Sequence, residues 1–226
     1  MSDGEQVDPS RGGVLWRRGD EPEFGRVVFF SDAVFAIALT LLALDLRVTD
    51  LRGDPDAPSS MLAALDDLVP QLIAYGVGFL LLAKYWLAHH RFMSRVGAID
   101  GRFMGLNLVY LGFVALLPFP TALIGEYESN PISGVAFALA LATVSIMETV
   151  LLVHAHRAGL FIHPLAEARF RQEVLASTQP AIMFLVTIPI AFINPTYMLL
   201  SWLVAAPLLG WLLNRSGLDR APGSGT

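Results

Sequence analysis

Long apolar runs recur along the chain and define its organisation. Six of them approach the roughly 20 residues that an α-helix needs to cross a bilayer. They predict spans at residues 27–46, 68–88, 103–124, 132–153, 174–193 and 196–213. Only Asn194 and Pro195 separate the last two runs, so we expect these two helices to form a hairpin at one membrane face. The pattern predicts an all-α membrane protein with six transmembrane helices.

The basic residues lie in alternate connections, which orients the predicted bundle. They precede span one, lie between spans two and three and between spans four and five, and follow span six: Arg11, Arg17, Arg18, Arg26, Arg91, Arg95, Arg102, Arg157, Arg169, Arg171, Arg215 and Arg220. The opposite side has only Arg47 and Arg52, set among acidic residues. Because short cytoplasmic loops are enriched in Lys and Arg, we expect both termini in the cytoplasm. The acidic outer side would either concentrate cations at a pore mouth or simply keep the loops hydrated.

The composition also indicates a multi-pass membrane protein, which we expect in the cell membrane. Of the 226 residues, 54% are hydrophobic and 15% are charged, which is too apolar for a soluble domain of this length. The absence of cysteine excludes a disulfide framework and thiolate metal sites. Residues 1–23 lack the apolar core of a secretory signal and predict a disordered cytoplasmic tail. Residues 214–226 predict a second tail, which leaves residues 24–213 as one six-helix transmembrane domain.

Polar residues at the start of the first span are the best indication of function. Arg26, Ser31 and Asp32 lie where a membrane helix normally carries apolar residues. Ionisable groups are costly in a bilayer and usually mark a functional site. We therefore expect the function of the chain to depend on its first helix.

The same residues resemble a known signature. Arg26, Phe30, Ser31 and Asp32 form the pattern Arg-x-x-x-Phe-Ser-Asp, followed by the apolar run 36–44, and this is similar to the transmembrane protein 175 family of potassium channels in its prokaryotic form. Two later segments are also similar to that family: Trp86-Leu87-Ala88-His89-His90-Arg91-Phe92, and Leu117-Pro118-Phe119-Pro120-Thr121 with Glu126-Tyr127. The resemblance implies a K⁺-preferring cation channel that conducts passively. The motif occurs once, so the chain has one six-helix unit. The resemblance implies that four such chains assemble as a homotetramer, each giving its first helix to a central pore.

The resemblance also implies where the pore is closed. The constriction of the family maps onto Ile37, Leu41 and Leu44, and its pore-facing threonine onto Thr40. On a helix the three apolar residues fall within about 60° of one another, and a ring of such side chains blocks ions by dewetting. A stripe of this kind also occurs in ordinary helix packing. Arg26 and Phe30 lie close to the same stripe, so spacing alone does not select the gate.

Asp32 is predicted to face neighbouring helices, because it lies about 140° from Ile37 around the helix. A carboxylate at that depth needs donors, and we expect Asp32 and Ser31 to bond with some of Trp86, His89 and Lys84 in span two. The alternative is that Asp32 carries protons. Glu148, a second carboxylate within a span, has no assigned role from the sequence.

Two other functional classes remain as alternatives to the channel. A proton-coupled or ion-coupled secondary transporter would bind its substrate at broken helices, but the chain shows no paired halves. An intramembrane enzyme is disfavoured because no nucleophile has a matched base. The five histidines are too few for a membrane metal oxidase, so we expect no cofactor or metal centre. The expected partners are membrane lipids, other copies of the chain and permeant K⁺, with Rb⁺ and Cs⁺ as further permeant ions, and no nucleic acid.

Overall fold

The computed structural model describes residues 16–18, 23–48, 54, 56–202 and 204–205. The chain is helical, as predicted. Its elements are β1 (Trp16–Arg17), α1 (Glu23–Leu44), α2 (Pro58–Asp67), α3 (Val69–Arg95), β2 (Ala98–Ile99), α4 (Gly101–Leu116), α5 (Pro118–Glu126), α6 (Pro131–Arg157), α7 (Glu167–Val186) and α8 (Ile188–Ala191).

Five helical segments of the described part are long and apolar enough to cross a membrane: Glu23–Leu44, Val69–Arg95, Gly101–Glu126, Pro131–Arg157 and Glu167–Ala191. They correspond to the first five predicted spans. The sixth, at residues 196–213, lies mostly outside the described residues. Its beginning is helical over residues 195–202, and the Asn194 side chain caps this helix by accepting a hydrogen bond from the backbone N–H of Thr196 at 2.7 Å.

The second, third and fifth predicted spans differ from the observed helices. The fifth, predicted at 174–193, begins earlier and is divided at Thr187 into α7 and α8. The third span is divided at Leu117, because Pro118 lacks a backbone N–H and therefore begins a new helix, α5. The second span, predicted to end at residue 88, continues as α3 to Arg95. Phe92 and Met93 are buried in this extension, so packing against neighbouring segments sustains the helix beyond its apolar run.

Part of the predicted N-terminal tail is folded, which corrects the expectation that residues 1–23 are disordered. Trp16 and Arg17 form β1, which pairs antiparallel with β2 in the connection between α3 and α4. Trp16 lies opposite Ile99, and Arg17 lies opposite Ala98. The pairing places the chain that leads into α1 against the ends of α3 and α4.

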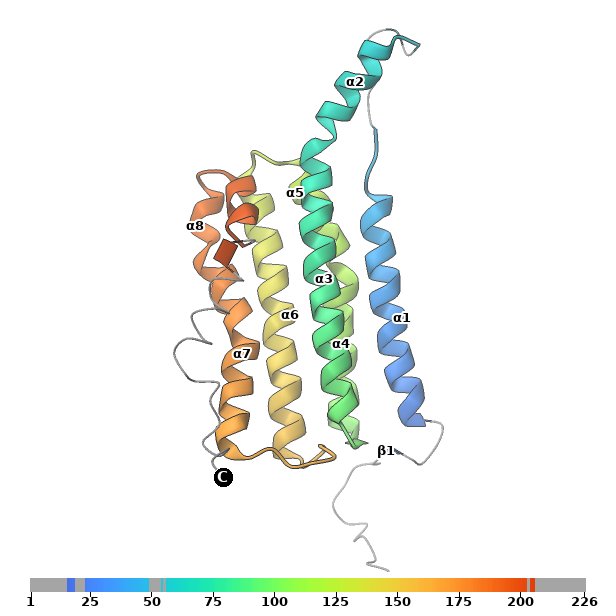
Figure 1. Ribbon diagram of the computed structural model, residues 1–226, viewed down its shortest axis with the longest axis vertical. Helices are drawn as coiled ribbons and strands as arrows, with labels where there is room; N and C mark the ends of the chain where they lie inside the picture. The colour runs from blue at the N-terminus through green and yellow to red at the C-terminus, as the bar shows by residue number, and fades with distance from the viewer. Residues whose placement is uncertain (1–15, 19–22, 49–53, 55, 203, 206–226) are drawn as a thin grey trace, which may run out of the picture.

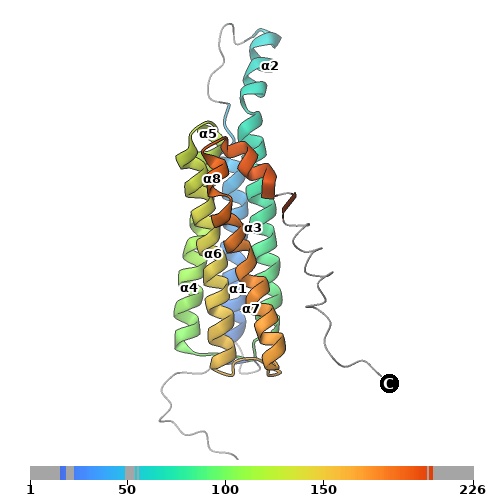
Figure 2. The ribbon, with the colours of Figure 1, turned by 90° about the vertical axis from the view of Figure 1, so that its left-hand side faces the viewer.

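The helices form an elongated bundle with α1 at one side and α7 and α8 at the other (Figure 1). Between them stand α3, α4 and α6, and α2 projects beyond the bundle as an extension of α3 (Figure 2). The end that carries β1 also holds the start of α1, the end of α3 and the start of α7, and we call it the basic end after its arginines Arg18, Arg91, Arg95, Arg102, Arg157 and Arg169. The opposite end carries Asp45, Asp54, Asp56, Asp66, Asp67, Glu126 and Glu128, and we call it the acidic end.

Candidate functional site

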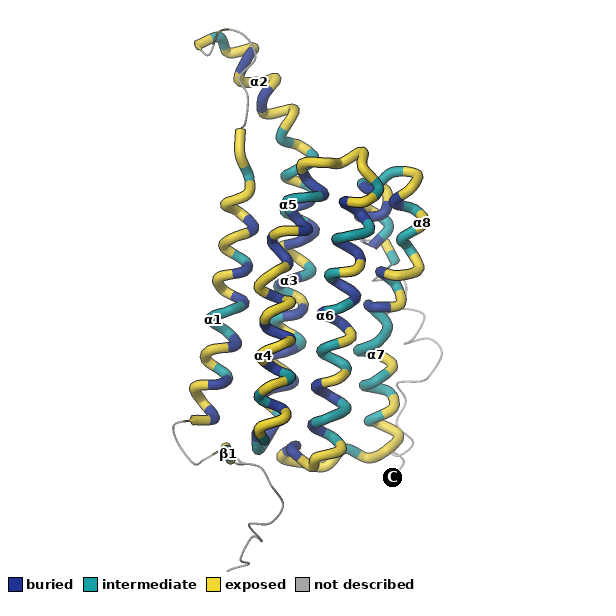
Figure 3. Tube along the Cα trace, turned by 180° about the vertical axis from the view of Figure 1, so that it is seen from behind, coloured by how far each residue is buried: buried dark blue, intermediate teal, exposed yellow. Residues whose placement is uncertain are grey.

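Helix α1 lies at one edge of the bundle and has two distinct faces (Figure 3). Its inner face packs on α3, α4 and α5 through side chains at intervals of three or four residues: Phe24, Val27, Ser31, Phe35, Ala38 and Leu42. On its outer face Ile37 and Leu44 are 59% and 65% exposed, and Leu41 is 39% exposed. A single subunit therefore leaves a continuous apolar stripe on α1 without a partner among the described residues.

Thr40 adds a polar group beside this stripe. Its hydroxyl donates a hydrogen bond to the backbone carbonyl of Ile37 at 2.7 Å, and the side chain is exposed. Because the proton is used within the helix, the lone pairs of the oxygen are directed outward. Arg26 and Phe30 are exposed nearer the basic end of the same helix. The outer face thus combines apolar side chains with one oxygen acceptor and one cation.

Asp32 holds α1 to α3. The indole N–H of Trp86 donates a hydrogen bond to Oδ1 of Asp32 at 2.9 Å, and Nδ1 of His90 lies 4.0 Å from the same oxygen. The rings of Trp86 and His90 lie 5.6 Å apart, so the two side chains support each other. Two residues of α3, one helical turn apart, therefore face one carboxylate of α1.

Ser31 joins α1 to α4 instead of α3. Its hydroxyl donates to the carbonyl of Val27 at 2.9 Å and accepts a hydrogen bond from the side-chain amide of Asn107 at 3.1 Å. Asn107 is completely buried and was missed by the sequence reasoning. Asn107 could have been identified from the sequence, since it is the lone side-chain amide in the predicted span 103–124. A polar side chain within a membrane helix is costly unless it has a partner.

His89 and Lys84 were among the candidate partners of Asp32 and Ser31, but neither forms a hydrogen bond with them. His89 is buried, with its ring stacked on Tyr110 at 5.1 Å and tilted against Phe35 at 5.8 Å. Among the described residues neither of its ring nitrogens has a hydrogen-bond partner. The histidine therefore belongs to the aromatic core beneath α1.

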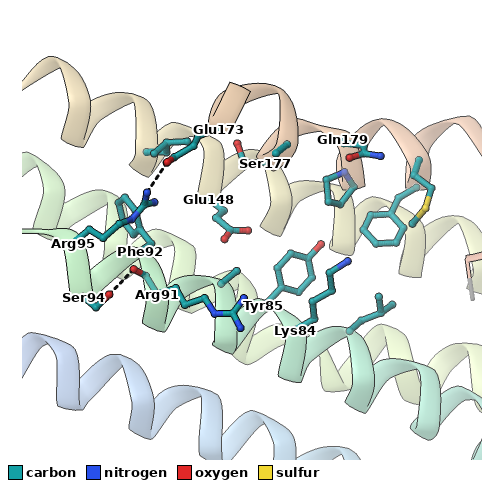
Figure 4. Close-up of a pocket in the computed structure, with 17 residues that line it drawn as sticks. Lys84, Tyr85, Arg91, Phe92, Ser94, Arg95, Glu148, Glu173, Ser177 and Gln179 are labelled. Atoms are coloured by element: carbon teal, nitrogen blue, oxygen red, sulfur yellow. Dashed lines mark hydrogen bonds and ion pairs between the residues drawn. The ribbon is translucent and has the colours of Figure 1, made fainter. Parts of the chain in front are cut away.

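Lys84 faces the opposite side of α3, where a cavity of about 710 Å³ lies between α3, α6 and α7 (Figure 4). Glu148 of α6 points into this cavity near Lys84 and Tyr85. The Tyr85 hydroxyl is bonded to α6, through the carbonyl of Leu141 and the hydroxyl of Ser145. Lys84 and Glu148 thus line a polar site that is separate from the outer face of α1.

The basic end contains a further carboxylate whose charge is stabilised. Asp100 caps α4 by accepting a hydrogen bond from the backbone N–H of Phe103 at 2.6 Å, and its Oδ1 lies 3.0 Å from Nε2 of His154. Burial by itself would raise the pKa of Asp100, but these hydrogen bonds outweigh burial and hold the pKa below its ordinary value. Asp100 is therefore ionised near neutral pH and joins the start of α4 to the end of α6.

No group of three or more His, Asp or Glu side chains within the described ranges is arranged to hold a metal ion. The polar side chains of α1 serve instead to fix the helix and to line its outer face.

Comparison with known proteins identifies the family of the chain. The family model described as endosomal/lysosomal potassium channel TMEM175 matches residues 26–118. The chain is 36% identical over 150 residues to a potassium channel of Streptomyces collinus, covering 65% of this chain and 71% of that protein. It is 33% identical to a potassium channel of Chamaesiphon minutus, covering 77% of this chain and 87% of that protein.

A solved structure extends the likeness to three dimensions. It is the crystal structure of a lysosomal potassium-selective channel TMEM175 homolog from Chamaesiphon minutus. That structure superposes with a TM-score of 0.67 and 29% identity, over 85% of this chain and 98% of the other. With these sequence and structural matches, the chain belongs to the TMEM175 family.

Proposed function

We propose that this protein is a potassium-selective channel of the cell membrane, through which K⁺ flows passively down its electrochemical gradient. The observation that carries the proposal is the outer face of α1, an apolar stripe with one hydroxyl oxygen that a single subunit leaves uncovered. The bacterial relatives are named potassium channels, which supports K⁺ as the permeant ion. Rb⁺ and Cs⁺, which resemble K⁺ in size and charge, would also permeate.

The proposed assembly is a homotetramer with α1 nearest the axis. One helix cannot enclose a passage, and α1 stands at the edge of the bundle with its stripe facing outward (Figure 1). Closed cyclic symmetry would bring equivalent stripes together around a common axis, which removes them from lipid and encloses a space. Lipid would then contact the outer helices of each subunit.

Ile37, Leu41 and Leu44 would form the gate of this passage. They occupy two helical turns, or about 10 Å along α1 at 1.5 Å per residue. Rings of apolar side chains at this spacing would exclude water until the passage widens, and ions cannot cross a dewetted segment. Thr40, between these levels, would offer an oxygen to a partly dehydrated cation.

The remaining motif residues would fix the pore helix within its subunit. The bond from Trp86 to Asp32 reaches α3, and the bond from Asn107 to Ser31 reaches α4. We assign the basic end to the cytoplasm because short cytoplasmic loops are enriched in Arg. The acidic end would then face outward, and its carboxylates would raise the local concentration of cations.

The start of the proposed sixth span, at Thr196, is attached to α7. Trp202 packs against Phe184 of α7, with ring centroids 4.8 Å apart, and its indole N–H donates to the Thr187 hydroxyl at 2.7 Å. Six spans would place both termini in the cytoplasm. The rest of this span and the tail proposed for residues 214–226 lie outside the described residues.

Reversal potentials measured in planar bilayers under K⁺/Na⁺ bi-ionic conditions test the proposal. We expect the reversal potential of the purified protein to have the sign and size of a pore that is more permeable to K⁺ than to Na⁺. Leu41→Ala should raise the current at rest because a shorter side chain widens the apolar ring. Leu80→Ala, which makes the same change at an exposed position of α3, is the matched control and should leave the resting current unchanged. Absence of any K⁺ current from well-folded protein would refute the proposal.

A coupled transporter is the second candidate, and one observation favours it. The cavity lined by Lys84 and Glu148 would place two opposite charges within the membrane-spanning region. Phe184, which lines the same cavity, contacts Trp202 near the start of the proposed sixth span. Turnover that saturates at a few hundred ions per second and requires a second gradient would favour the transporter.

A further inference from the structure

A single arginine ahead of α1 is bonded to the end of α3. Arg18 donates from Nη2 to the carbonyl of Met93 at 2.8 Å and from Nε to the carbonyl of Val96 at 3.1 Å. Its backbone N–H also donates to the carbonyl of Gly97 at 2.8 Å. The last carbonyls of a helix lack i+4 partners within the helix, and a guanidinium can donate hydrogen bonds to two of them at once. Arg18 therefore caps the C-terminus of α3.

The same guanidinium contacts the start of α1. Its central carbon lies 4.9 Å from the centroid of the Phe24 ring, which is within the range of a cation–π interaction. Phe24 belongs to the first turn of α1 and is only 6% exposed. One side chain thus touches both the last turn of α3 and the first turn of α1.

The surface that receives Arg18 is itself held by backbone hydrogen bonds. The N–H of Gly97 donates to the carbonyl of Leu160 at 2.7 Å, and the N–H of Ile162 donates to the carbonyl of Arg95 at 3.0 Å. A Cβ atom at Gly97 would lie 3.1 Å from Cγ1 of Ile162, so the two segments are in close contact. The connection between α6 and α7 therefore supports the site that Arg18 binds.

We infer that Arg18 is a positioning residue, which restrains the basic end of α1 against α3 and thereby favours the closed arrangement of the pore helix. The inference rests on the proposed channel function. Asp32, the other attachment to α3, lies eight residues beyond Phe24, or about 12 Å along the helix. Two attachments this far apart fix the tilt of α1. Loss of the one at Arg18 weakens the restraint on the first turns of α1, which can then tilt more easily about the other, and tilting widens the passage.

Arg17 and Arg18 provide a matched pair of variants. Arg17 lies next to Arg18 in the chain and is exposed, as Arg18 is, and it is the β1 residue opposite Ala98. We expect Arg18→Ala to raise the probability that the channel is open by about tenfold, the effect of losing about 1.4 kcal/mol of restraint. Arg17→Ala should leave it within about twofold of the wild type. The open probability of Arg18→Lys should lie between those of the wild type and Arg18→Ala, because an ammonium keeps the charge but lacks the paired N–H donors of a guanidinium.

Amide hydrogen exchange measures the restraint independently of current. Residues 23–30 should exchange about tenfold faster in Arg18→Ala than in Arg17→Ala, because about 1.4 kcal/mol of protection is lost. If Arg18→Ala does not fold, Phe24→Leu tests the α1 half of the contact, since it removes the ring and keeps the apolar bulk. The K⁺/Na⁺ permeability ratio should not change in any of these variants.

The outcomes separate the two proposals. Faster exchange with an unchanged open probability would mean that Arg18 only stabilises the fold, and this would overturn the inference. Equal exchange in the two alanine variants would overturn it as well. A wild-type protein that passes no K⁺ would refute the channel, whereas the exchange rates would still decide whether Arg18 restrains α1.

Discussion

The hydrogen bond from Trp86 to Asp32 can be tested by removing its donor. Trp86→Phe retains an aromatic ring beside His90 but lacks the indole N–H, which lies 2.9 Å from Oδ1 of Asp32. The carboxylate then keeps only His90, whose Nδ1 is 4.0 Å away and beyond good hydrogen-bond distance. The variant therefore leaves a charged group of α1 without its main donor.

The expected cost follows from the charge and the exposure of Asp32. A hydrogen bond to a charged group contributes about 1.5–3 kcal/mol, and the Asp32 side chain is 37% exposed, so water replaces part of the loss. We expect Trp86→Phe to lower the free energy of unfolding by about 1–1.5 kcal/mol per subunit. Neutral acceptors form bonds about half as strong, so the same substitution in an Asp32→Asn background should cost only about 0.5–0.8 kcal/mol.

A double-mutant cycle on detergent-solubilised protein provides the assay. Unfolding of the wild type, both single variants and the double variant is followed by circular dichroism as denaturant is added. The coupling between the two positions should be about 0.5–0.8 kcal/mol. An equal cost of Trp86→Phe in both backgrounds would show that the indole contributes only packing, and the assignment of Asp32 as an anchor of α1 would then be wrong.

Two further predictions concern pH and packing. Because the pKa of Asp100 is lowered in the folded protein, its stabilising contribution is complete above the ordinary pKa of 3.8 and is lost as the pH falls through the lower folded value. The free energy of unfolding, measured against pH, should therefore decline below about pH 4. This decline should be weaker in Asp100→Asn. Gly78→Ala would place a Cβ atom 2.7 Å from Cγ2 of Thr121 and should lower the free energy of unfolding by about 1–3 kcal/mol. Gly76→Ala, which meets no atom within 4 Å in the same helix, is its control and should be neutral or slightly stabilising in the same denaturation assay.

The spans were predictable because a membrane helix needs a long apolar run, whatever it packs against. The break at Leu117 was less visible, since Pro118 and Pro120 lie inside an apolar run and a hydropathy pattern does not register a missing N–H. The pairing of β1 with β2 involves two residues in each strand, which is too short for any periodic pattern. The fold could therefore be predicted at the level of helices, but not at the level of the connections that lock their ends.

The partners of Asp32 show what helical geometry could have added. Residues two apart in a helix lie about 200° apart around its axis, so Trp86 and Lys84 cannot both face the same carboxylate. Residues four apart lie on one face, and this selects His90 as the neighbour of Trp86. His89 is turned by about 100° from His90 and faces the core instead. Asn107 could not be paired with Ser31 in this way, because the sequence does not tell which face of α4 meets α1.

The adjacency of Ser31 and Asp32 explains how α1 can present a defined face to a pore. Lipid tails are as apolar as leucine, so apolar contacts alone provide little drive to hold one membrane helix against another. Neighbouring residues project about 100° apart, and the two side chains accordingly reach different helices, α4 through Asn107 and α3 through Trp86. A single bond would act as a pivot about which α1 could rotate, whereas two bonds in different directions fix its rotation. With the inner side fixed, Ile37 must point away from the subunit, and the orientation of the proposed gate is set five residues before the gate begins.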